Sequence, residues 1–230
     1  MLQQLYGDVY CWTERHGKPE TTYYWNSFAI HLSPANVLAL VDPLPLSVED
    51  IKQIEEIGRP THILLTCNWH LREAELFRQR WGCKIYINEL GLEEAETQID
   101  GTFKHGDRLW DSIEVIHIPN VSWLEETGLL VTPEKGLLIL GDALCGGRAD
   151  VGIPDGEVGI FQIKHIPDRH KAQNSLCQLM EYSFDAICFG HGSPILHQAK
   201  AALQRFIDAG LCEYDTYYLT QVATERVPVE

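Results

Sequence analysis

Residues 61–72, which read THILLTCNWHLR, limit the possible folds more than any other segment of the chain. They begin with a short apolar run at residues 63–65, pass through a polar turn and enter a helical pattern at residues 71–81. A strand followed so closely by a helix predicts an α/β unit. In such a unit the loop that leaves the carboxyl end of the strand is exposed yet rigidly held, so we expect a functional site at this turn.

The alternation of strand and helix patterns continues along the chain. Strand patterns lie at residues 8–12, 23–30, 36–42, 84–88, 113–118, 127–131, 137–142 and 185–191. Helical patterns lie at residues 48–57, 91–98, 168–182 and 198–208. The glycine-rich residues 146–159 predict a loop that borders a pocket. We therefore expect one α/β (α+β) domain over residues 1–209, with residues 210–230 as a tail that packs on the body or on a neighbouring molecule.

The composition is that of a globular protein with an acidic surface. The 230 residues include 33 Asp and Glu against 18 Lys and Arg, which gives a formal charge of -15. Such a surface repels phosphate backbones, so we expect no nucleic-acid partner. No segment has the length and apolarity of a membrane span, and the first residues lack the pattern of a signal peptide. The sequence therefore predicts a cytoplasmic protein that does not bind membranes.

The seven cysteines agree with a reducing compartment. They are odd in number and scattered, and no CxxC pair occurs among them. This pattern favours free thiols over a disulfide framework or a structural zinc site. The aromatic tail, with Tyr214, Tyr217 and Tyr218, permits a homodimer without requiring one.

Three predicted strands end in side chains that can carry chemistry. Asp42 ends the strand at residues 36–42, Asp142 ends the run Leu-Gly-Asp, and His191 ends the run Phe-Gly-His. Carboxylates and imidazoles act as general acids and bases and as metal ligands. With His70 of the first turn, Asp142 and His191 are the candidate catalytic residues.

The turn at residues 66–72 resembles the metal-binding turn of the metallo-β-lactamase fold, which reads Thr-His-X-His-X-Asp-His after such a strand. In this chain it reads Thr66-Cys67-Asn68-Trp69-His70-Leu71-Arg72. Aligned on the threonine, Cys67 and Trp69 stand where the first two histidines belong. Leu71 replaces the aspartate and Arg72 replaces the last histidine, while His70 falls at a spacer position. The resemblance is to a family member with a rewritten metal turn.

The resemblance extends to the polar strand ends. Asp142 is similar to the family's bridging aspartate, His191 to its final metal histidine, and Asp42 to an aspartate that braces the metal turn. These signals follow one another in the order of the family. They imply a four-layer αββα sandwich, metallo-β-lactamase-like, with the site between the edges of two sheets. Asn68 and Trp69 are then expected to line the pocket.

The resemblance also implies a ligand that this chain lacks. A further metal histidine should lie between the strands at residues 113–118 and 127–131, but residues 119–126 read PNVSWLEE, with Ser122 near the expected place. A catalytic zinc site needs about three protein ligands and one open position. Asp142 and His191 supply two, and a third would have to come from His70, Cys67 or Glu126. We therefore expect no two-zinc centre, and at most a single divalent ion, zinc or iron.

A metal-free site would need another source of positive charge. Asp142 in a partly enclosed site without a counter-charge would be costly. Arg72, which stands where a metal histidine stood, could reach the vacated position and bind the carboxylate with two hydrogen bonds. We therefore predict that Arg72 pairs with Asp142 and takes over the structural role of the metal.

The residues leave three functions open, and with them the question whether the protein is an enzyme. The first is a metal-dependent hydrolase of a small ester, thioester or lactone that uses a rearranged mononuclear site. The second is a metal-poor or metal-free, hydrolase-like relative with weak or no activity, whose pocket binds a small molecule. The third is a metal-free catalyst in which Cys67 or His70 acts directly. The missing ligands favour the second.

Overall fold

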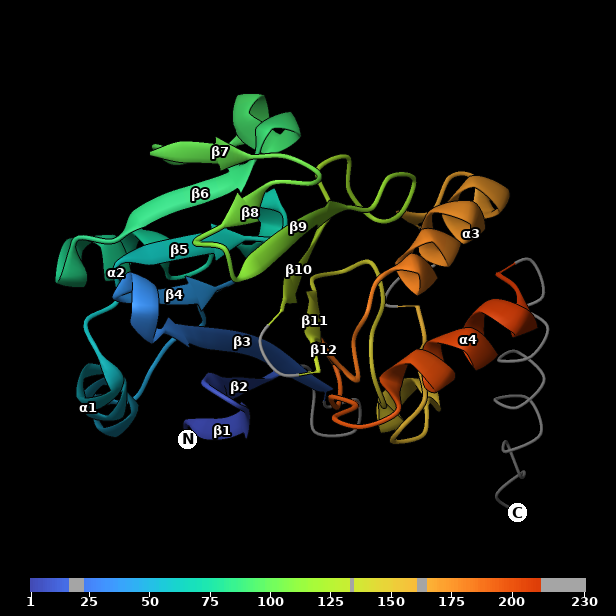
Figure 1. Ribbon diagram of the computed structural model, residues 1–230, viewed down its shortest axis with the longest axis horizontal. Coiled ribbons are helices and arrows are strands. Elements are labelled where there is room, and N and C mark those ends of the chain that lie inside the picture. Colours follow the sequence, from blue (N-terminus) through green and yellow to red (C-terminus); the bar gives the residue numbers. More distant parts are fainter. Residues whose placement is uncertain (17–22, 133–134, 161–164, 212–230) are drawn as a thin grey trace, which may run out of the picture.

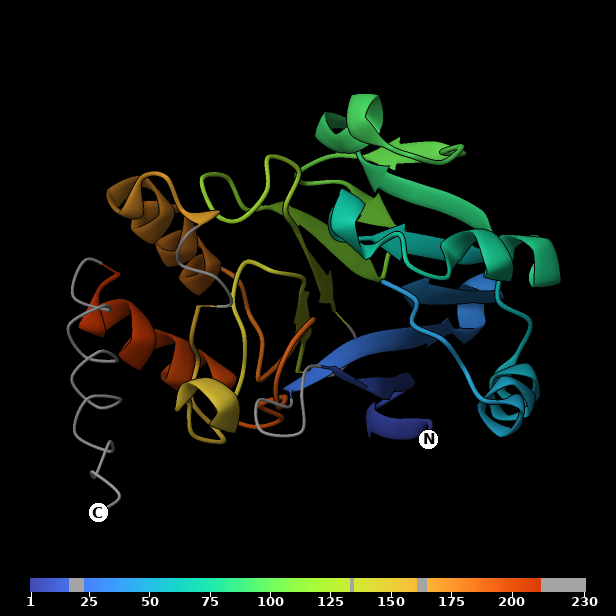
Figure 2. The ribbon, with the colours of Figure 1, turned by 180° about the vertical axis from the view of Figure 1, so that it is seen from behind.

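The chain forms two β-sheets that pack face to face, with helices on both outer faces (Figures 1 and 2). The computed structural model describes residues 1–16, 23–132, 135–160 and 165–211. The two sheets and their flanking helices confirm the predicted four-layer αββα sandwich. From residue 212 onward, the expected tail at 210–230 lies outside the described residues.

The first sheet has seven strands in the order of the chain. They are β1 (Gln3–Tyr6), β2 (Val9–His16), β3 (Tyr23–Leu32), β4 (Val37–Val41), β5 (His62–Leu65), β6 (Lys84–Asn88) and β7 (Gly101–Phe103). β1 to β4 pair antiparallel, whereas β4 to β7 pair parallel. β4 is apolar throughout because it is covered on both faces.

The second sheet has five strands in the order β12, β11, β10, β9, β8. They are β8 (Arg108–Leu109), β9 (Ile113–His117), β10 (Thr127–Val131), β11 (Leu137–Leu140) and β12 (Ala186–Phe189). β8 to β11 pair antiparallel, and β12 lies parallel to β11. β11 and β12 therefore end at the same edge of their sheet.

In the described residues, four α-helices and several 3-10 helices connect the strands. The α-helices are α1 (Val48–Ile57), α2 (Ala74–Trp81), α3 (Arg169–Cys177) and α4 (Ala199–Ala209). The 3-10 helices are η2 (Ser33–Ala35), η3 (Asn68–His70), η4 (Glu89–Glu94), η5 (Ala149–Val151) and η7 (Gln178–Glu181). α1 begins where Ser47 accepts a hydrogen bond from the Asp50 amide, and Gly82 ends α2 in the left-handed conformation.

Three apolar cores separate the four layers. One lies between the two sheets and includes Phe28 and Ile139. A second joins the first sheet to α1 and α2 through Ile54 and Phe77. The third joins the second sheet to α3 and α4 and includes Leu203. The site described below lies at the edge where the two sheets meet, supported by packed side chains on each side.

The boundaries of the central turn differ from the sequence pattern. The predicted helix at residues 71–81 begins only at Ala74, because residues 68–70 form the 3-10 helix η3. The pattern at residues 91–98 corresponds to the 3-10 helix η4. None of the helices in the described ranges is both long and apolar enough to cross a membrane.

Candidate functional site

The candidate site lies where four strands end. Asp42 follows β4, Thr66 follows β5, Asp142 follows the end of β11, and His191 follows β12. All four side chains are buried. Because β4 and β5 form one parallel pair and β11 and β12 another, their carboxyl ends meet at one edge of the sandwich.

His70 lies at the centre of this edge. Its Nδ1 is 2.9 Å from Asp42 Oδ2 and 2.9 Å from the Thr66 hydroxyl oxygen. Its Nε2 is 3.3 Å from Asp142 Oδ1. Only 3% of the residue is exposed. The short helix η3 turns this side chain inward, so His70 bridges two carboxylates although the aligned sequence places it at a spacer position.

Asp42 holds His70 in place. Its Oδ1 accepts a hydrogen bond from the Thr66 amide at 2.8 Å, and its Oδ2 accepts one from the Thr66 hydroxyl at 2.6 Å. The backbone of Asp42 has a φ of 49°, in the left-handed region that Asp tolerates better than most residues. The strand end is thus bent so that the carboxylate points at the turn that carries His70.

Asp142 joins the two imidazoles to the second sheet. Its Oδ1 lies 2.9 Å from His191 Nε2, and its Oδ2 accepts a hydrogen bond from the Trp123 indole N–H at 3.0 Å. The Ser122 hydroxyl donates to the Asp142 backbone carbonyl at 2.9 Å. Ser122 therefore lies in the site, as the sequence position suggested, but it contacts the backbone of Asp142.

Glu126 supports the turn that carries Asp142. Its Oε1 accepts hydrogen bonds from the amides of Asp142 at 2.9 Å and Ala143 at 3.1 Å. Its Oε2 is buried and makes no hydrogen bond within the described part of the chain. Glu126 thus positions Asp142 through the backbone while one of its own oxygens faces the interior.

The buried groups have unequal protonation states. Burial opposes a charge on His70, but the surrounding Cys67, Asp42 and Asp142 outweigh it and raise the pKa of His70 well above its usual value. Burial would raise the pKa of Asp142, yet the charge of His70 and the contacts with His191 hold it well below its usual value. These shifts favour a protonated His70 beside an ionised Asp142.

The other two groups shift toward their neutral forms. Burial and the nearby Asp142 charge raise the pKa of Glu126 well above its usual value, which favours the carboxylic acid. Burial lowers the pKa of His191 to about 4, although Asp142 opposes this shift. His70 contacts both Asp42 and Asp142.

Arg72 does not pair with Asp142, and the prediction of that ion pair is wrong. Its guanidinium Nη1 donates to the carbonyl oxygens of Asn26 at 3.2 Å and Asp42 at 3.0 Å, and it lies over the Trp25 ring, 5.0 Å from the centroid. The φ of Arg72 is 39°, so the backbone is left-handed here, and the guanidinium binds these two carbonyl oxygens instead of the Asp142 carboxylate. His70 supplies the charge instead.

Cys67 is fully buried next to His70. Burial raises the pKa of its thiol to about 12. A thiol with that pKa is neutral at physiological pH, which contradicts the hypothesis of a Cys67 nucleophile activated by a lowered pKa. Its sulfur can still matter as a ligand atom, because one donor atom each from Cys67, His70 and Asp142 lie within 4.8 Å of one another.

Two predicted pocket residues lie outside this cluster. Asn68 donates from its side chain to the Gly91 carbonyl at 3.0 Å, and its amide donates to Glu125 at 2.8 Å, so it braces η4. Trp69 is 70% exposed and stacks on Trp123. Sequence reasoning missed Thr66 and Trp123 as site residues. Thr66 could have been found, because it is the threonine on which the turn at residues 66–72 is aligned. No local sequence pattern marks Trp123.

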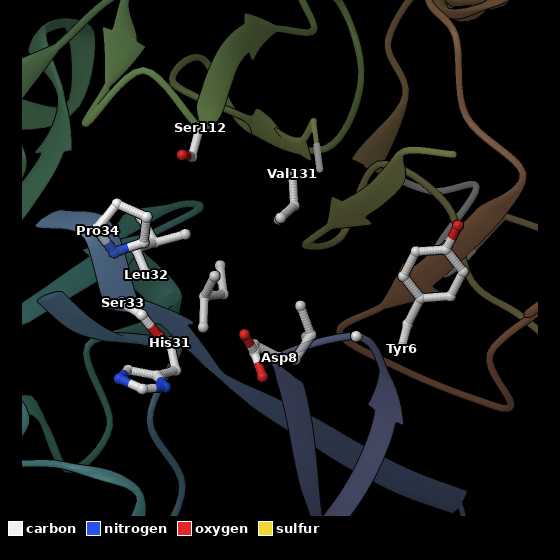
Figure 3. Close-up of a pocket in the computed structure, with 11 residues that line it drawn as sticks. Tyr6, Asp8, His31, Leu32, Ser33, Pro34, Ser112 and Val131 are labelled. Carbon is white, nitrogen blue, oxygen red and sulfur yellow. The ribbon is translucent and has the colours of Figure 1, made fainter. Parts of the chain in front are cut away.

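Two cavities of the molecule lie outside this cluster. A cavity of about 240 Å³ opens between the β1–β2 turn and η2, where Figure 3 shows Asp8, Ser112 and Val131 around it. That is the opposite end of the sandwich, because Val131 ends β10 beside the start of β11. A second cavity, of about 330 Å³, includes Asn26 and Gly192 in its lining, next to His191. Neither is lined by His70 or Asp142.

Comparison with known proteins identifies the family. The model of the metallo-beta-lactamase superfamily matches residues 2–209, so the chain belongs to this superfamily. Among curated proteins, none matches the chain.

Solved structures share the fold at low sequence identity. A mutant of a flavo di-iron protein from Thermotoga maritima superposes with a TM-score of 0.71 at 14% identity, covering 91% of this chain and 62% of that one. A metallo-beta-lactamase from Pontibacter korlensis superposes with a TM-score of 0.65 at 15% identity, and the match covers 90% of this chain and 97% of that one. The subclass B3 metallo-beta-lactamase BJP-1 of Bradyrhizobium japonicum superposes with a TM-score of 0.60 at 14% sequence identity. The match covers 97% of this chain and 95% of BJP-1. This chain thus spans 62% of the flavo di-iron chain.

The donor set can be tested against the metals implied by the superfamily. Within the described residues, the donor atoms that lie close together come from Cys67, His70 and Asp142, with His191 beside Asp142. Three such donors would suit a single ion. Asp142 Oδ1 has two imidazole nitrogens nearby but accepts no hydrogen bond of good geometry within the described residues.

Proposed function

We propose that this protein is a hydrolase-like member of the metallo-β-lactamase superfamily that is metal-poor or metal-free and has weak or no hydrolase activity. The observation that carries the proposal is the position of His70 between Asp42 and Asp142. In this proposal the protonated imidazole does electrostatically what a bound cation would do.

Charge balance supports the proposal. Buried carboxylates without a partner of opposite charge cost several kcal/mol. His70 contacts both carboxylates, and its pKa is raised well above the usual value by its negative neighbours. The network is therefore stable without a metal, and a metal would have to displace the proton of His70 to bind its Nε2.

Access to the site also supports weak hydrolysis. A hydrolytic metal needs an open position for water and substrate. Here His70, Asp142 and His191 are all buried. Trp123 covers Asp142 from the surface side and donates to its Oδ2. None of these three side chains therefore presents an exposed polar group where the chemistry would occur.

The test is elemental analysis of protein produced with added zinc and iron and purified without chelator. We expect well under one ion per chain, together with ester, thioester and lactone hydrolysis that is equal in the wild type and in His191→Gln. About one or more ions per chain, with activity that is lost in His191→Gln, would overturn the proposal. Circular dichroism of the variant separates loss of activity from loss of fold.

A second candidate, a hydrolase with one divalent ion, is favoured by the close donor atoms of Cys67, His70 and Asp142. A bound zinc or iron ion would polarise the substrate carbonyl and activate water. Asp42 would orient the His70 ring through Nδ1, and His191 would lie beside Asp142. Titration with cobalt(II) tests this candidate: a thiolate-to-cobalt absorption band should appear in the wild type and disappear in Cys67→Ser.

We also propose a cytoplasmic location. The described cysteines are all free thiols, and five of the six are buried. Free thiols persist where the compartment is reducing. Alkylation of the purified protein under denaturing conditions should label every cysteine without prior reduction.

A further inference from the structure

We propose that the stacked indoles of Trp69 and Trp123 form a binding platform for a small planar cation, such as an N-alkylated heteroaromatic ring. The platform lies on the surface directly above Asp142. The proposal goes beyond the proposed function and does not depend on whether the buried site holds a metal.

The geometry of the two rings leaves one indole face open. Their centroids are 5.2 Å apart and their planes differ by 26°, a stacked arrangement. Trp123 thus covers one side of Trp69, yet Trp69 remains 70% exposed. An indole with both faces covered could not be exposed to that extent. The outer face of Trp69 is therefore free to stack on a planar ligand.

The platform is held in place before any ligand binds. Trp123 is anchored from below by its hydrogen bond to Asp142 Oδ2 and is packed by the His165 ring, whose centroid is 5.1 Å away. The backbone that carries Trp69 is fixed by the adjacent Asn68, which is hydrogen-bonded to Glu125 and to the Gly91 carbonyl. A ring that is already ordered loses little conformational entropy on binding.

The charges around the platform favour a cation. Tryptophan is the best aromatic partner for a cation over its ring face. The neighbouring helix η4, which Asn68 contacts at Gly91, exposes Glu89, Glu93 and Glu94. The nearby Arg72 points away, toward Trp25. With a chain charge of -15, an anionic aromatic ligand would be repelled and a cationic one attracted.

The test is a titration of the full chain with three probes of similar shape: N-methylquinolinium, neutral quinoline and anionic 2-naphthoate. Binding is followed by the proton chemical shifts of each probe, at an ionic strength of about 0.15 M, which screens diffuse surface attraction. We expect saturable binding of the cation with one site, and affinity about tenfold or more weaker for the other two probes. Equal binding of all three probes, or a cation signal that does not saturate, would overturn the proposal.

Variants locate the site. Trp69→Ala should weaken cation binding about tenfold or more, and Trp69→Phe should lie between it and the wild type. Because Trp69 is largely exposed, its removal leaves the core intact. Trp110→Ala is the matched control, since that half-buried indole packs on His62 at the start of β5, away from the site. Unchanged binding in Trp69→Ala, or equal loss in Trp110→Ala, would show that the platform is not the binding site.

Discussion

A single histidine decides the electrostatics of the candidate site. On a solvent-exposed turn, His70 would be mostly neutral at physiological pH. In this fold its Nδ1 meets Asp42 and its Nε2 meets Asp142, so the proton is held from both sides. His191, only a short distance away, is neutral because burial lowers its pKa to about 4. The surroundings of these two histidines thus shift their pKa values in opposite directions, upward for His70 and downward for His191.

The Asp142 carboxylate should be among the most important side chains for stability. In Asp142→Asn the charge that faces His70 is lost, and Trp123 loses a charged acceptor. We expect the free energy of unfolding to fall by about 3 kcal/mol, as is usual when one partner of a buried ion pair is removed. Urea unfolding measures this change. The control, Asp155→Asn, alters an exposed carboxylate and should change stability by less than about 0.5 kcal/mol.

Glu126→Gln should change the pH dependence of stability. Since the folded-state pKa of Glu126 is raised above its ordinary 4.5, folding at neutral pH takes up a proton. The raised pKa of Glu126 therefore lowers the free energy of unfolding. This loss of stability is absent below the ordinary pKa of Glu126 and grows as the pH rises toward its folded-state pKa. Glutamine keeps the acceptor for the Asp142 and Ala143 amides without this proton uptake.

The measurement is urea unfolding of both proteins, with chelator present, from about pH 5 to about pH 8. The variant should gain stability over the wild type by about 1 kcal/mol per pH unit across this window. If the two curves run parallel, Glu126 is ionised in the folded protein and the assignment of a neutral acid is wrong.

At the scale of elements, the site depends on how closely the ends of β5 and β11 approach. The Thr127 amide at the start of β10 donates to the Thr66 carbonyl at the end of β5, which ties the two sheets together by backbone. Gly141 follows β11 at this joint. A Cβ at Gly141 would lie 2.2 Å from the Thr66 hydroxyl oxygen and 2.8 Å from Glu126 Oε1. The joint therefore requires a residue without a side chain.

Gly141→Ala should separate the two strand ends. The methyl group would displace Thr66, which fixes both Asp42 and His70, so we expect a loss of about 1–3 kcal/mol in the free energy of unfolding. Gly58→Ala is the control, because its nearest neighbour would be Leu38 at 3.9 Å and its backbone is extended. Equal effects of the two substitutions would contradict the role assigned to the joint.

At the scale of the whole molecule, the three apolar cores hold the four layers together and bring the strand ends to one edge. The site residues come from both sheets, so their arrangement depends on the packing of the sandwich. His70 balances the charge of Asp142 across this interface. His70 and Asp142 thus link the two sheets through their side chains.

Chelation should leave the fold unaffected. We expect the melting temperature of protein purified without chelator to change by less than about 1 °C when EDTA is added, because a ligand that is not bound cannot stabilise the folded state. Differential scanning calorimetry provides the measurement, and EDTA already saturated with calcium is the control for ionic effects. A drop of several degrees with EDTA alone would indicate a tightly held ion and favour the mononuclear alternative.

Much of the fold and part of the site can be predicted from local patterns. The helix at residues 48–57 and the strand at residues 84–88 coincide with α1 and β6, because cap residues and apolar runs are local signals. The polar strand ends Asp42, Asp142 and His191 meet in space. Asp142 and His191 do so because β11 and β12 are parallel neighbours that end at the same edge. Asp42 comes from the other sheet and joins them through His70 once the two sheets pack.

The direction and charge of the side chains in the turn were decided only by the tertiary structure. A 3-10 helix rotates successive side chains differently from an α-helix, so His70 points inward and Arg72, with a left-handed backbone, points away. Trp123 meets Asp142 only because β10 and β11 are adjacent. Protonation of His70 and Cys67 follows from burial and from charges brought together by distant segments, which no local spacing encodes.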